Sequence, residues 1–332
     1  MNRHLVTLDD VTAGDIQELF DLAASLKAKQ RQGIPHGPLQ GKTLAMIFEK
    51  PSLRTRVTFE AGMTQLGGHA IYLAPADIRL GQRETVQDAA RNLERWVDGI
   101  VARTFSHQMV ERLALYSRVP VINGLSDGHH PVQILCDLFT LWERRGPVAG
   151  LRVAYIGDGN NVCHSWLQGA AKMGVHFTVA CPSGYEPDPA VMAQVQEEAK
   201  ASGARLTVTH DPGAAARGAD VLYTDVWASM GQEEEHVRRL RDFQGFQLDR
   251  TLVDQAGPDA LVMHCLPAHR GEEITDEIMD GPRSIVFDQA ENRLHMQKAI
   301  LVRLLGRGAE PRAGYPRDSA GGREPRVQDV NS

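Results

Sequence analysis

Residues 43–62 read TLAMIFEKPSLRTRVTFEAG, an apolar run followed immediately by a helical pattern. The run is typical of a buried strand, and Ser52 after Pro51 is a plausible N-cap for the helix that follows. Arg54 then falls in the first helical turn, where a cation opposes the helix dipole. A solvated helix start explains Ser52 but leaves Arg54 unexplained. Free N–H groups and a guanidinium at one strand-to-helix turn instead favour an anion site.

The same strand-then-helix unit recurs along the chain. Short apolar runs predict strands at residues 43–48, 69–74, 98–104, 119–124, 151–159, 177–181, 205–210, 221–226, 260–267 and 284–289. Amphipathic segments predict helices at 16–26, 53–66, 85–97, 108–117, 132–145, 161–174, 190–203 and 293–305. This alternation predicts an α/β fold of two doubly wound domains, with parallel sheets flanked by helices and bridging helices between the domains.

The domain boundary is expected where Gly146 and Pro147 interrupt the pattern. The sequence therefore predicts a first domain at residues 1–146 and a second at 147–291. The last helix, 292–306, is expected to pack back onto the first domain. The tail at 307–332 is rich in Gly, Pro and charge, with almost no apolar periodicity, and is predicted to be disordered.

The composition narrows the class of partners and the compartment. Of the 332 residues, 42% are hydrophobic and 23% charged, and the formal net charge of −6 argues against a nucleic-acid or anionic-membrane partner. The four cysteines form no C-x-x-C pair, which fits neither a zinc site nor a disulfide framework. No apolar run approaches the roughly 20 residues that span a bilayer, and the N-terminus does not resemble a targeting peptide. We therefore expect a cytoplasmic protein.

Ligands of doubly wound sheets bind beyond the carboxyl ends of the strands, so the turns there are candidate sites. The segment HHPVQ follows an expected strand and places Pro131 at the first helical position. His130 and Gln133 then offer donors that can polarise a carbonyl. A purely structural histidine is the alternative at this turn.

The segment DGNNV at 158–162 resembles a dinucleotide-binding turn only in part. Gly157 and Gly159 follow a strand, but Val162 stands where the third glycine would be, which disfavours nucleotide binding. Two amides remain, and a turn-forming role suits Asn160 better than Asn161.

Two further segments, DVWASMG and HCLP, leave later strands. Asp225 ends an expected strand ahead of Trp227 and Met230, and apolar residues beside an aspartate indicate a pocket rather than a surface loop. Cys265 leaves the next strand ahead of Pro267. Burial as an apolar residue is the commoner fate of a cysteine, but this position favours contact with a ligand.

The segments SLRTR, ARTF, HPVQ, DGNNV, DVWASMG, HCLP and ENRLHMQ occur in an order that resembles the aspartate/ornithine carbamoyltransferase family. The resemblance covers residues 4–306. SLRTR and HPVQ are similar to the whole family, whereas DVWASMG and HCLP are similar to its ornithine branch. The resemblance implies transfer of a carbamoyl group from carbamoyl phosphate to L-ornithine, without metal or organic cofactor. It also implies a homotrimer with active sites at subunit interfaces, and a role in arginine biosynthesis.

The resemblance further implies roles for individual residues. The first domain would bind carbamoyl phosphate and the second ornithine. The expected carbamoyl phosphate contacts are Ser52, Leu53, Arg54, Thr55, Arg79, Arg103, His130, Gln133, Cys265, Leu266 and Arg293. The expected ornithine contacts are Asn161, Asp225, Ser229 and Met230, and the expected catalytic residues are Arg103, His130, Asp225 and Cys265.

Two positions depart from the family pattern, and several alternatives remain. Leu53 stands where threonine is common, and Arg79 stands where glutamine or histidine is usual, in a loop expected to reach a neighbouring subunit. A related amine such as putrescine or N-acetylornithine, or the catabolic direction, is an alternative within the family. A nonenzymatic anion-binding role is a second alternative, and a nucleotide-binding dehydrogenase is the least favoured.

Overall fold

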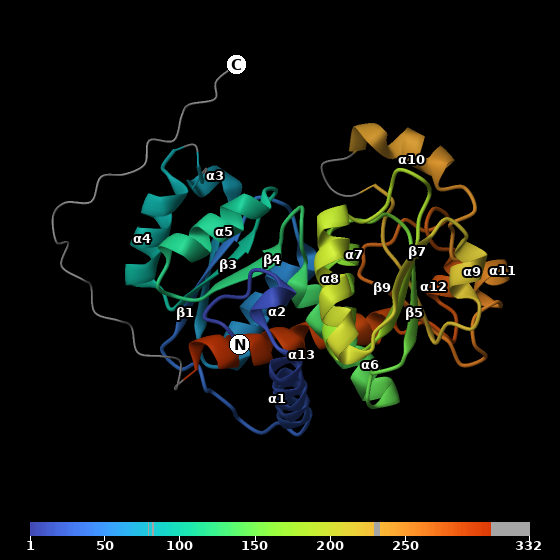
Figure 1. Ribbon diagram of the computed structural model, residues 1–332. Helices are drawn as coiled ribbons and strands as arrows, with labels where there is room; N and C mark the ends of the chain where they lie inside the picture. Colours follow the sequence, from blue (N-terminus) through green and yellow to red (C-terminus); the bar gives the residue numbers. More distant parts are fainter. Residues whose placement is uncertain (79, 82, 229–232, 307–332) are drawn as a thin grey trace, which may run out of the picture.

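The computed structural model describes residues 1–78, 80–81, 83–228 and 233–306, which form two parallel sheets covered by helices (Figure 1). The first sheet has the strand order β2-β1-β3-β4. Its strands are β1 Thr43–Phe48, β2 His69–Leu73, β3 Gly99–Arg103 and β4 Val121–Leu125. The second sheet has the order β7-β6-β5-β8-β9. Its strands are β5 Arg152–Ile156, β6 His176–Ala180, β7 Leu206–Thr209, β8 Val221–Thr224 and β9 Leu261–His264.

Helices connect the successive strands. In the first half they are α1 Ala13–Arg31, α2 Leu53–Gln65, α3 Pro75–Ile78, α4 Val86–Trp96, α5 His107–Tyr116 and α6 Pro131–Arg145, with a 3₁₀ turn at Leu8–Asp10. In the second half they are α7 Asn161–Met173, α8 Pro189–Ser202, α9 Pro212–Ala216, α10 His236–Asp242, α11 Arg250–Val253, α12 Asp276–Met279 and α13 Val286–Leu305, with a 3₁₀ turn at Glu233–Glu235. The predicted α/β class with two parallel-sheet units is confirmed.

The strand order reverses once in each sheet. β1 pairs in parallel with both β2 and β3, and β5 pairs in parallel with both β6 and β8. Connections leave such a central strand to opposite sides, which opens a crevice at its carboxyl end. The topology therefore offers a binding position beyond β1 in one sheet and beyond β5 in the other.

The expected strand at residues 284–289 is wrong. Only Ser284 forms a bridge, to Val262, and Val286 already opens α13. Phe287 is 66% exposed, whereas Val286 and Gln289 are buried, so the burial follows a helical period and not an alternating one. An apolar run this short does not distinguish a strand from the start of a buried helix. The last helix begins at Val286, six or seven residues before the predicted start at 292–293.

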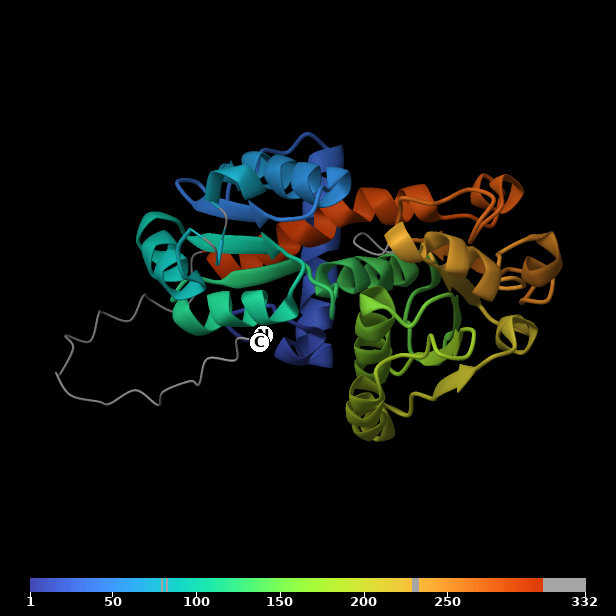
Figure 2. The ribbon, with the colours of Figure 1, turned by 90° about the horizontal axis from the view of Figure 1, so that it is seen from above.

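Two helices join the halves of the molecule. In both ribbon views α13 runs from beside the first sheet toward the second sheet (Figures 1 and 2). It packs against α6, α1 and α2. Lys298 on α13 is fully buried and donates to Gln30 and Gln65, each at 3.0 Å. These hydrogen bonds offset the cost of burying the amine.

A buried carboxylate ties α6 to both α13 and the second sheet. Asp137 on α6 accepts hydrogen bonds from Gln133 (2.8 Å), Gln289 (2.7 Å) and Tyr223 (2.8 Å). Burial raises the pKa of Asp137 to about 6, against the opposing effect of these donors. Because Tyr223 belongs to β8, this network fixes α6 and the second sheet relative to one another.

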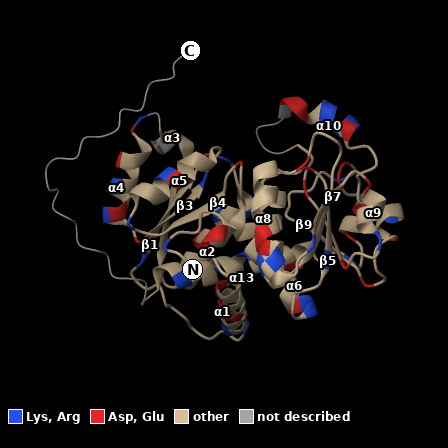
Figure 3. Ribbon diagram, viewed as in Figure 1, with Lys and Arg blue, Asp and Glu red and all other residues tan. Residues whose placement is uncertain are grey.

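Charges of both signs are interspersed on the surface helices. Figure 3 shows Lys and Arg beside Asp and Glu on α8 and α10. This arrangement agrees with the small net charge and gives no extended basic face in that view. Among the helices in the described residues, none combines the length and apolar character needed to cross a membrane.

The buried His295 on α13 predicts a defined loss of stability in acid. Burial lowers its pKa to about 4, and the nearby Lys27 and Lys298 act in the same direction. The unfolded chain therefore binds a proton at this position near pH 6.5, well before the folded protein does. Protonation of the unfolded chain at His295 therefore lowers the free energy of unfolding. The loss is absent above pH 6.5 and complete below pH 4, where it amounts to about 2–3 kcal/mol. We expect His295→Gln to reduce the difference in free energy of unfolding between pH 7.5 and pH 4.5, measured by urea denaturation. An unchanged difference would contradict this.

Candidate active site

The segments that leave six strands converge on one cavity of about 730 Å³. They follow β1, β3 and β4 of the first sheet and β5, β8 and β9 of the second. The cavity therefore lies between the carboxyl ends of both sheets, where the topology places a ligand. It is lined by these of the residues singled out in the sequence: Ser52, Leu53, Arg54, Thr55, Arg103, His130, Gln133, Asn161, Asp225, Cys265, Leu266 and Arg293. The other three, Arg79, Ser229 and Met230, lie outside the described residues.

The start of α2 forms one wall. Ser52 is the N-cap, as predicted, and its side chain accepts a hydrogen bond from the Thr55 N–H at 3.2 Å. Arg54 faces the cavity. Arg56 does not line the cavity; its guanidinium lies 3.6 Å from the centre of the Tyr72 ring and 3.5 Å from a Glu60 carboxylate oxygen. The two arginines of this turn thus have separate surroundings.

Three guanidinium groups meet at this wall: Arg54, Arg103 and Arg293. Within the described part of the chain, none of the three forms an ion pair. Burial lowers the pKa of Arg103 to about 10, and the positive charges of Arg293 and Arg54 lower it further. Like charges held together without a counter-ion raise the free energy of the empty site. An anion such as phosphate would relieve this repulsion.

Arg293 reaches the cluster from α13. It is 2% exposed and donates to Thr55 Oγ1 at 3.0 Å and to the side-chain oxygen of Gln133. Its Nε, like that of Arg103, is buried without a hydrogen-bond partner in the protein. Buried donors are almost always satisfied, so these groups indicate a ligand or solvent partner.

His130 stands beside the arginines as a neutral imidazole. Its backbone N–H donates to Ser165 Oγ at 2.8 Å, and its side-chain Nδ1 is buried without a partner. Burial lowers the pKa of His130 far below its usual value, and the three neighbouring guanidiniums act in the same direction. A neutral imidazole can donate one N–H to a carbonyl oxygen, and it carries no acidic proton to lose.

The opposite wall carries Asp225 and Cys265. Asp225 accepts hydrogen bonds from Asn160 Nδ2 (2.9 Å), from the Val226 N–H (2.8 Å) and from the Cys265 thiol (2.9 Å). Burial raises the pKa of the Cys265 thiol well above its usual value, and the Asp225 carboxylate contributes to the same effect. Cys265 is therefore a neutral donor. Among the described residues that line the cavity, Asp225 is the carboxylate that faces the three arginines.

The raised pKa of Cys265 predicts slow alkylation. We expect iodoacetamide at pH 8 to modify Cys265 at least about tenfold more slowly than free cysteine, since only the thiolate reacts. Asp225→Asn removes one cause of the shift and should accelerate the reaction. Mass spectrometry can follow Cys265 alone, because Cys136, Cys163 and Cys181 are buried. Equal rates in both proteins would contradict the role of the carboxylate.

Asn160 and Asn161 have separate roles, and Asn160 makes one contact that the sequence did not predict. Asn160 caps α7 by accepting from the Val162 and Cys163 N–H groups at 2.9 and 3.1 Å, and it also holds Asp225. Asn161 lines the cavity, while its amide donates to the Ser126 carbonyl at 2.6 Å. The turn-forming reading of Asn160 therefore captured only half of its contacts.

Two other motif residues do not reach this cavity. Trp227 is 5% exposed and stacks on Phe243 with ring centres 5.3 Å apart, so it belongs to the core of the second sheet. The segment that holds Trp227 does border the expected pocket, through Asp225 and Ala228, but the Trp227 side chain does not line it. His129 packs against His107 instead, with ring centres 4.8 Å apart.

Several residues that line the cavity were not singled out in the sequence: Lys50, Leu125, Val162, Val226, Ala228, His236, Pro267 and His269. Lys50 follows β1 by two residues, and its position at a strand's carboxyl end was a usable signal. Its amine lies 4.6 Å from the centre of the Phe105 ring. His236 begins α10 and is brought to the cavity only by the tertiary fold.

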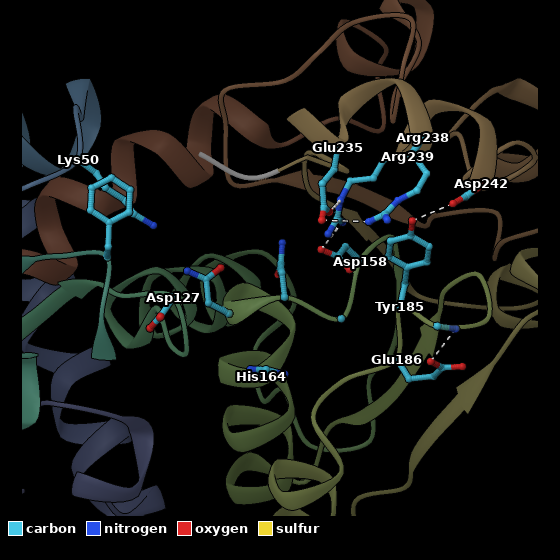
Figure 4. Close-up of a pocket in the computed structure, with 15 residues that line it drawn as sticks. Lys50, Asp127, Asp158, His164, Tyr185, Glu186, Glu235, Arg238, Arg239 and Asp242 are labelled. Carbon is cyan, nitrogen blue, oxygen red and sulfur yellow. Dashed lines mark hydrogen bonds and ion pairs between the residues drawn. The ribbon is translucent and has the colours of Figure 1, made fainter. Parts of the chain in front are cut away.

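A second cavity of about 780 Å³ adjoins the first and shares Lys50 and Asn161 with it (Figure 4). Arg239 crosses it to donate to Asp158 at 2.8 Å and to the Trp227 carbonyl at 2.7 Å. Burial raises the pKa of Asp158 to about 6. This buried pair anchors α10 to the chain that leaves β5 and β8, next to Asp225.

Comparison with known proteins identifies the family. The family models for the carbamoyl-P binding domain and the Asp/Orn binding domain of aspartate/ornithine carbamoyltransferase match residues 3–143 and 149–304. The chain is 54% identical over 303 residues to a protein of Anoxybacillus flavithermus named ornithine carbamoyltransferase, covering 91% of this chain and 96% of that protein. It is 53% identical over 304 residues to one of Pyrococcus furiosus named as anabolic, covering 92% and 96%.

Solved structures agree with this result. The ornithine carbamoyltransferase of Pyrococcus furiosus superposes with a TM-score of 0.89 at 52% identity, covering 92% of this chain and 97% of that chain. The anabolic enzyme of Campylobacter jejuni superposes with a TM-score of 0.87 at 41% identity, covering 92% and 99%. With both family models matched and a cavity that gathers the motifs of both halves, the chain belongs to the aspartate/ornithine carbamoyltransferase family.

Proposed function

We propose that the protein transfers the carbamoyl group of carbamoyl phosphate to the δ-amine of L-ornithine, giving L-citrulline and phosphate. The observation that carries this proposal is one cavity in which three guanidiniums, none of them ion-paired within the described residues, face the Asp225 carboxylate. A phosphate anion and an ammonium group are the complements of these two walls. The relatives named ornithine carbamoyltransferase support the choice of substrates.

Carbamoyl phosphate is assigned to the first domain, residues 1–146 together with the helix at 292–306. Arg54, the α2 N-terminus and the side chain of Ser52 hold the phosphate, and the Thr55 side chain contacts the carbamoyl end of the same substrate. The backbone of Leu53, the Cys265–Leu266 segment, Gln133 and Arg293 complete the contacts. Leu53 is 73% exposed, which suits a residue that binds through its backbone N–H and tolerates replacement of its side chain.

Ornithine is assigned to the second domain, residues 147–291. Asp225 binds the δ-ammonium, with Asn161 beside it. Ser229 and Met230 are proposed to contact the rest of the amino acid. Arg79 is proposed to add a contact to the phosphate of carbamoyl phosphate from a neighbouring subunit. The alternative substrates, putrescine and N-acetylornithine, lack the α-carboxylate or the free α-amine that this assignment requires.

The reaction follows from these positions. The δ-amine, with an unperturbed pKa of about 10.4, arrives as an ammonium and must lose a proton before it attacks. Asp225 stabilises the ammonium and receives its proton, while Cys265 remains a neutral donor to Asp225. The amine nitrogen then bonds to the carbamoyl carbon. The developing oxyanion accepts hydrogen bonds from Arg103, His130 and Thr55.

Collapse of this intermediate breaks the bond between the carbamoyl carbon and the phosphate oxygen. Phosphate leaves with the electron pair of that bond, stabilised by Arg54 and the α2 N-terminus. The second amine proton departs to solvent or to the phosphate. Atoms and charge balance without a metal or organic cofactor.

We also propose a biological setting. The anabolic names of two relatives support a role in arginine biosynthesis in the cytoplasm. A homotrimer with active sites at subunit interfaces is supported by the exposed apolar side chains of Leu53, Val57 and Ile71 around α2 and β2, at 73%, 52% and 41% exposure. Such side chains are commonly covered by a second subunit.

Citrulline formation by the purified protein tests the proposal. We expect turnover with carbamoyl phosphate and L-ornithine, measured colorimetrically as citrulline and as released phosphate in equal amounts. Turnover with putrescine or N-acetylornithine but not ornithine would transfer the activity to a related amine. Binding of carbamoyl phosphate without carbamoylation of any amine would favour a nonenzymatic role.

A further inference from the structure

Three potential metal ligands lie close together: His236, His269 and Glu272. The two histidines line the cavity. Their ligand atoms all lie within 4.8 Å of one another. His236 Nε2 is 3.1 Å from both carboxylate oxygens of Glu272, and His269 Nδ1 is 3.5 Å from one of them. Tetrahedral zinc with ligands at about 2.0–2.1 Å holds neighbouring ligand atoms about 3.3–3.4 Å apart. The two histidine–carboxylate separations therefore suit one shared ion.

His269 and Glu272 lie in a turn that is already formed in the protein without an ion. The Glu272 N–H donates to the His269 carbonyl at 2.9 Å. Gln247 then donates to the Glu272 carbonyl at 2.7 Å. Outer contacts of this kind orient ligands and strengthen metal binding.

His236 is anchored from the other side of the cavity. It begins α10, and Arg239 in the next turn is fixed by Asp158 and the Trp227 carbonyl. The two imidazoles come from segments that are 33 positions apart in sequence, yet their ring centres lie 6.4 Å apart. Both halves of the cluster are thus held in place independently.

An ion can reach this cluster from solvent. The side chains of His236, His269 and Glu272 are 39%, 44% and 26% exposed. His236 and His269 also line the cavity of about 730 Å³, so a bound ion would lie at its wall.

A neighbouring group of ligand types is unsuited to a metal. Asp225, His264 and Cys265 lie close together, but both ring nitrogens of His264 are engaged. Nδ1 accepts from the Leu266 N–H at 2.9 Å, and Nε2 bonds Glu273 at 3.0 Å. The Cys265 thiol donates to Asp225 and would have to lose its proton first. Binding there requires several hydrogen bonds to break.

We propose that His236, His269 and Glu272 form a binding site for a divalent cation of the zinc class. Two imidazole nitrogens and one carboxylate are ligands that zinc accepts, and three protein ligands leave a coordination position for water. The site is separate from carbamoyl transfer, no step of which passes through the ion. Its test does not depend on turnover.

Calorimetric titration of the full-length, chelator-treated protein with Zn²⁺ tests the proposal. We expect one saturable site per chain, and at least about tenfold weaker binding in His236→Gln and in Glu272→Gln. His210→Gln is the matched control, because His210 is an exposed histidine whose Nε2 lies 3.7 Å from a Glu186 oxygen. This variant should bind Zn²⁺ as the parent does. Cys265→Ser should also retain the site.

Thermal unfolding gives a second measurement. Zn²⁺ should raise the melting temperature of the parent and not that of Glu272→Gln, since only binding to the folded state stabilises it. Melting without metal shows whether each variant is folded. Absence of saturable binding in the parent, equal affinity in all variants, or loss of the site in Cys265→Ser overturns the proposal.

Discussion

Arg54→Ala is expected to lower kcat/KM for carbamoyl phosphate by about 10²–10³-fold. The guanidinium supplies charge-assisted hydrogen bonds to the phosphate, each worth about 1.5–3 kcal/mol, and two such bonds account for this loss. KM should rise and kcat should fall, because the same contacts bind the substrate's phosphate and stabilise phosphate as it leaves. Steady-state kinetics with ornithine at saturation measures the effect.

The apo protein should not be destabilised by this change. Arg54 lies beside Arg293 and Arg103 and forms no ion pair within the described residues. Burial and then the charge of Arg293 lower its pKa, against a smaller opposing effect of Asp225. Removing it relieves repulsion, so the melting temperature of Arg54→Ala should equal or exceed that of the parent. A large loss of activity in a protein of undiminished stability would then locate the effect in ligand binding.

Arg56→Ala is the matched control for this arginine. It belongs to the same helical turn but lies outside the cavity, against Tyr72 and Glu60. An exposed ion pair of this kind contributes at most about 1 kcal/mol, so kcat/KM should change by less than about threefold. If Arg54→Ala behaves like Arg56→Ala, the proposed role of Arg54 in binding phosphate is wrong.

Asp225→Asn is expected to lower kcat/KM for ornithine by at least about 100-fold. The substitution keeps the shape of the side chain and removes the charge that faces the δ-ammonium. It also removes the group that receives the amine proton, so kcat should fall as well as KM rise. The KM for carbamoyl phosphate should change little, because the three arginines remain. Initial rates with each substrate varied in turn separate the two effects.

Asp220→Asn provides the control at the opposite end of the same strand. Asp220 precedes β8 and pairs with Arg152 at the surface, at 3.1 Å, whereas Asp225 follows β8 and faces the cavity. We expect kinetics within about threefold of the parent for Asp220→Asn. Equal losses in the two variants would indicate damage to the sheet rather than loss of an ornithine contact.

The sequence predicted the elements of this fold better than their ends. The nine strands found in the described residues lie at or within a residue of predicted runs, because buried parallel strands read as short, continuous apolar segments. The strand expected at 284–289 failed for the same reason, since the buried first turn of α13 also presents a short apolar run. The strand and the helix are distinguished only by the burial pattern in the folded protein, in which Phe287 is exposed while Val286 is buried.

The candidate site could be predicted as far as each side chain belonged to a local motif. Ser52, Arg54 and His130 follow strands directly, so the rule for carboxyl ends found them. His236 and His269 were missed, because neither stands in a pattern that indicates a ligand. The pocket beside Asp225 was expected, but the burial of Trp227 in the core was not, because a sequence does not say whether an apolar residue in a loop turns toward a cavity or into the core.

By itself, the sequence determined the alternation of strands and helices, the caps at their ends and the order of the motifs, since these depend on neighbouring residues. The tertiary structure alone decided which charges meet. Arg293 comes from the last helix and Thr55 from the second, yet they lie 3.0 Å apart. It also decided that Arg54 and Arg56, two positions apart, face different surroundings. Long-range packing sets such distances, and with them the electrostatics that the proposed chemistry requires.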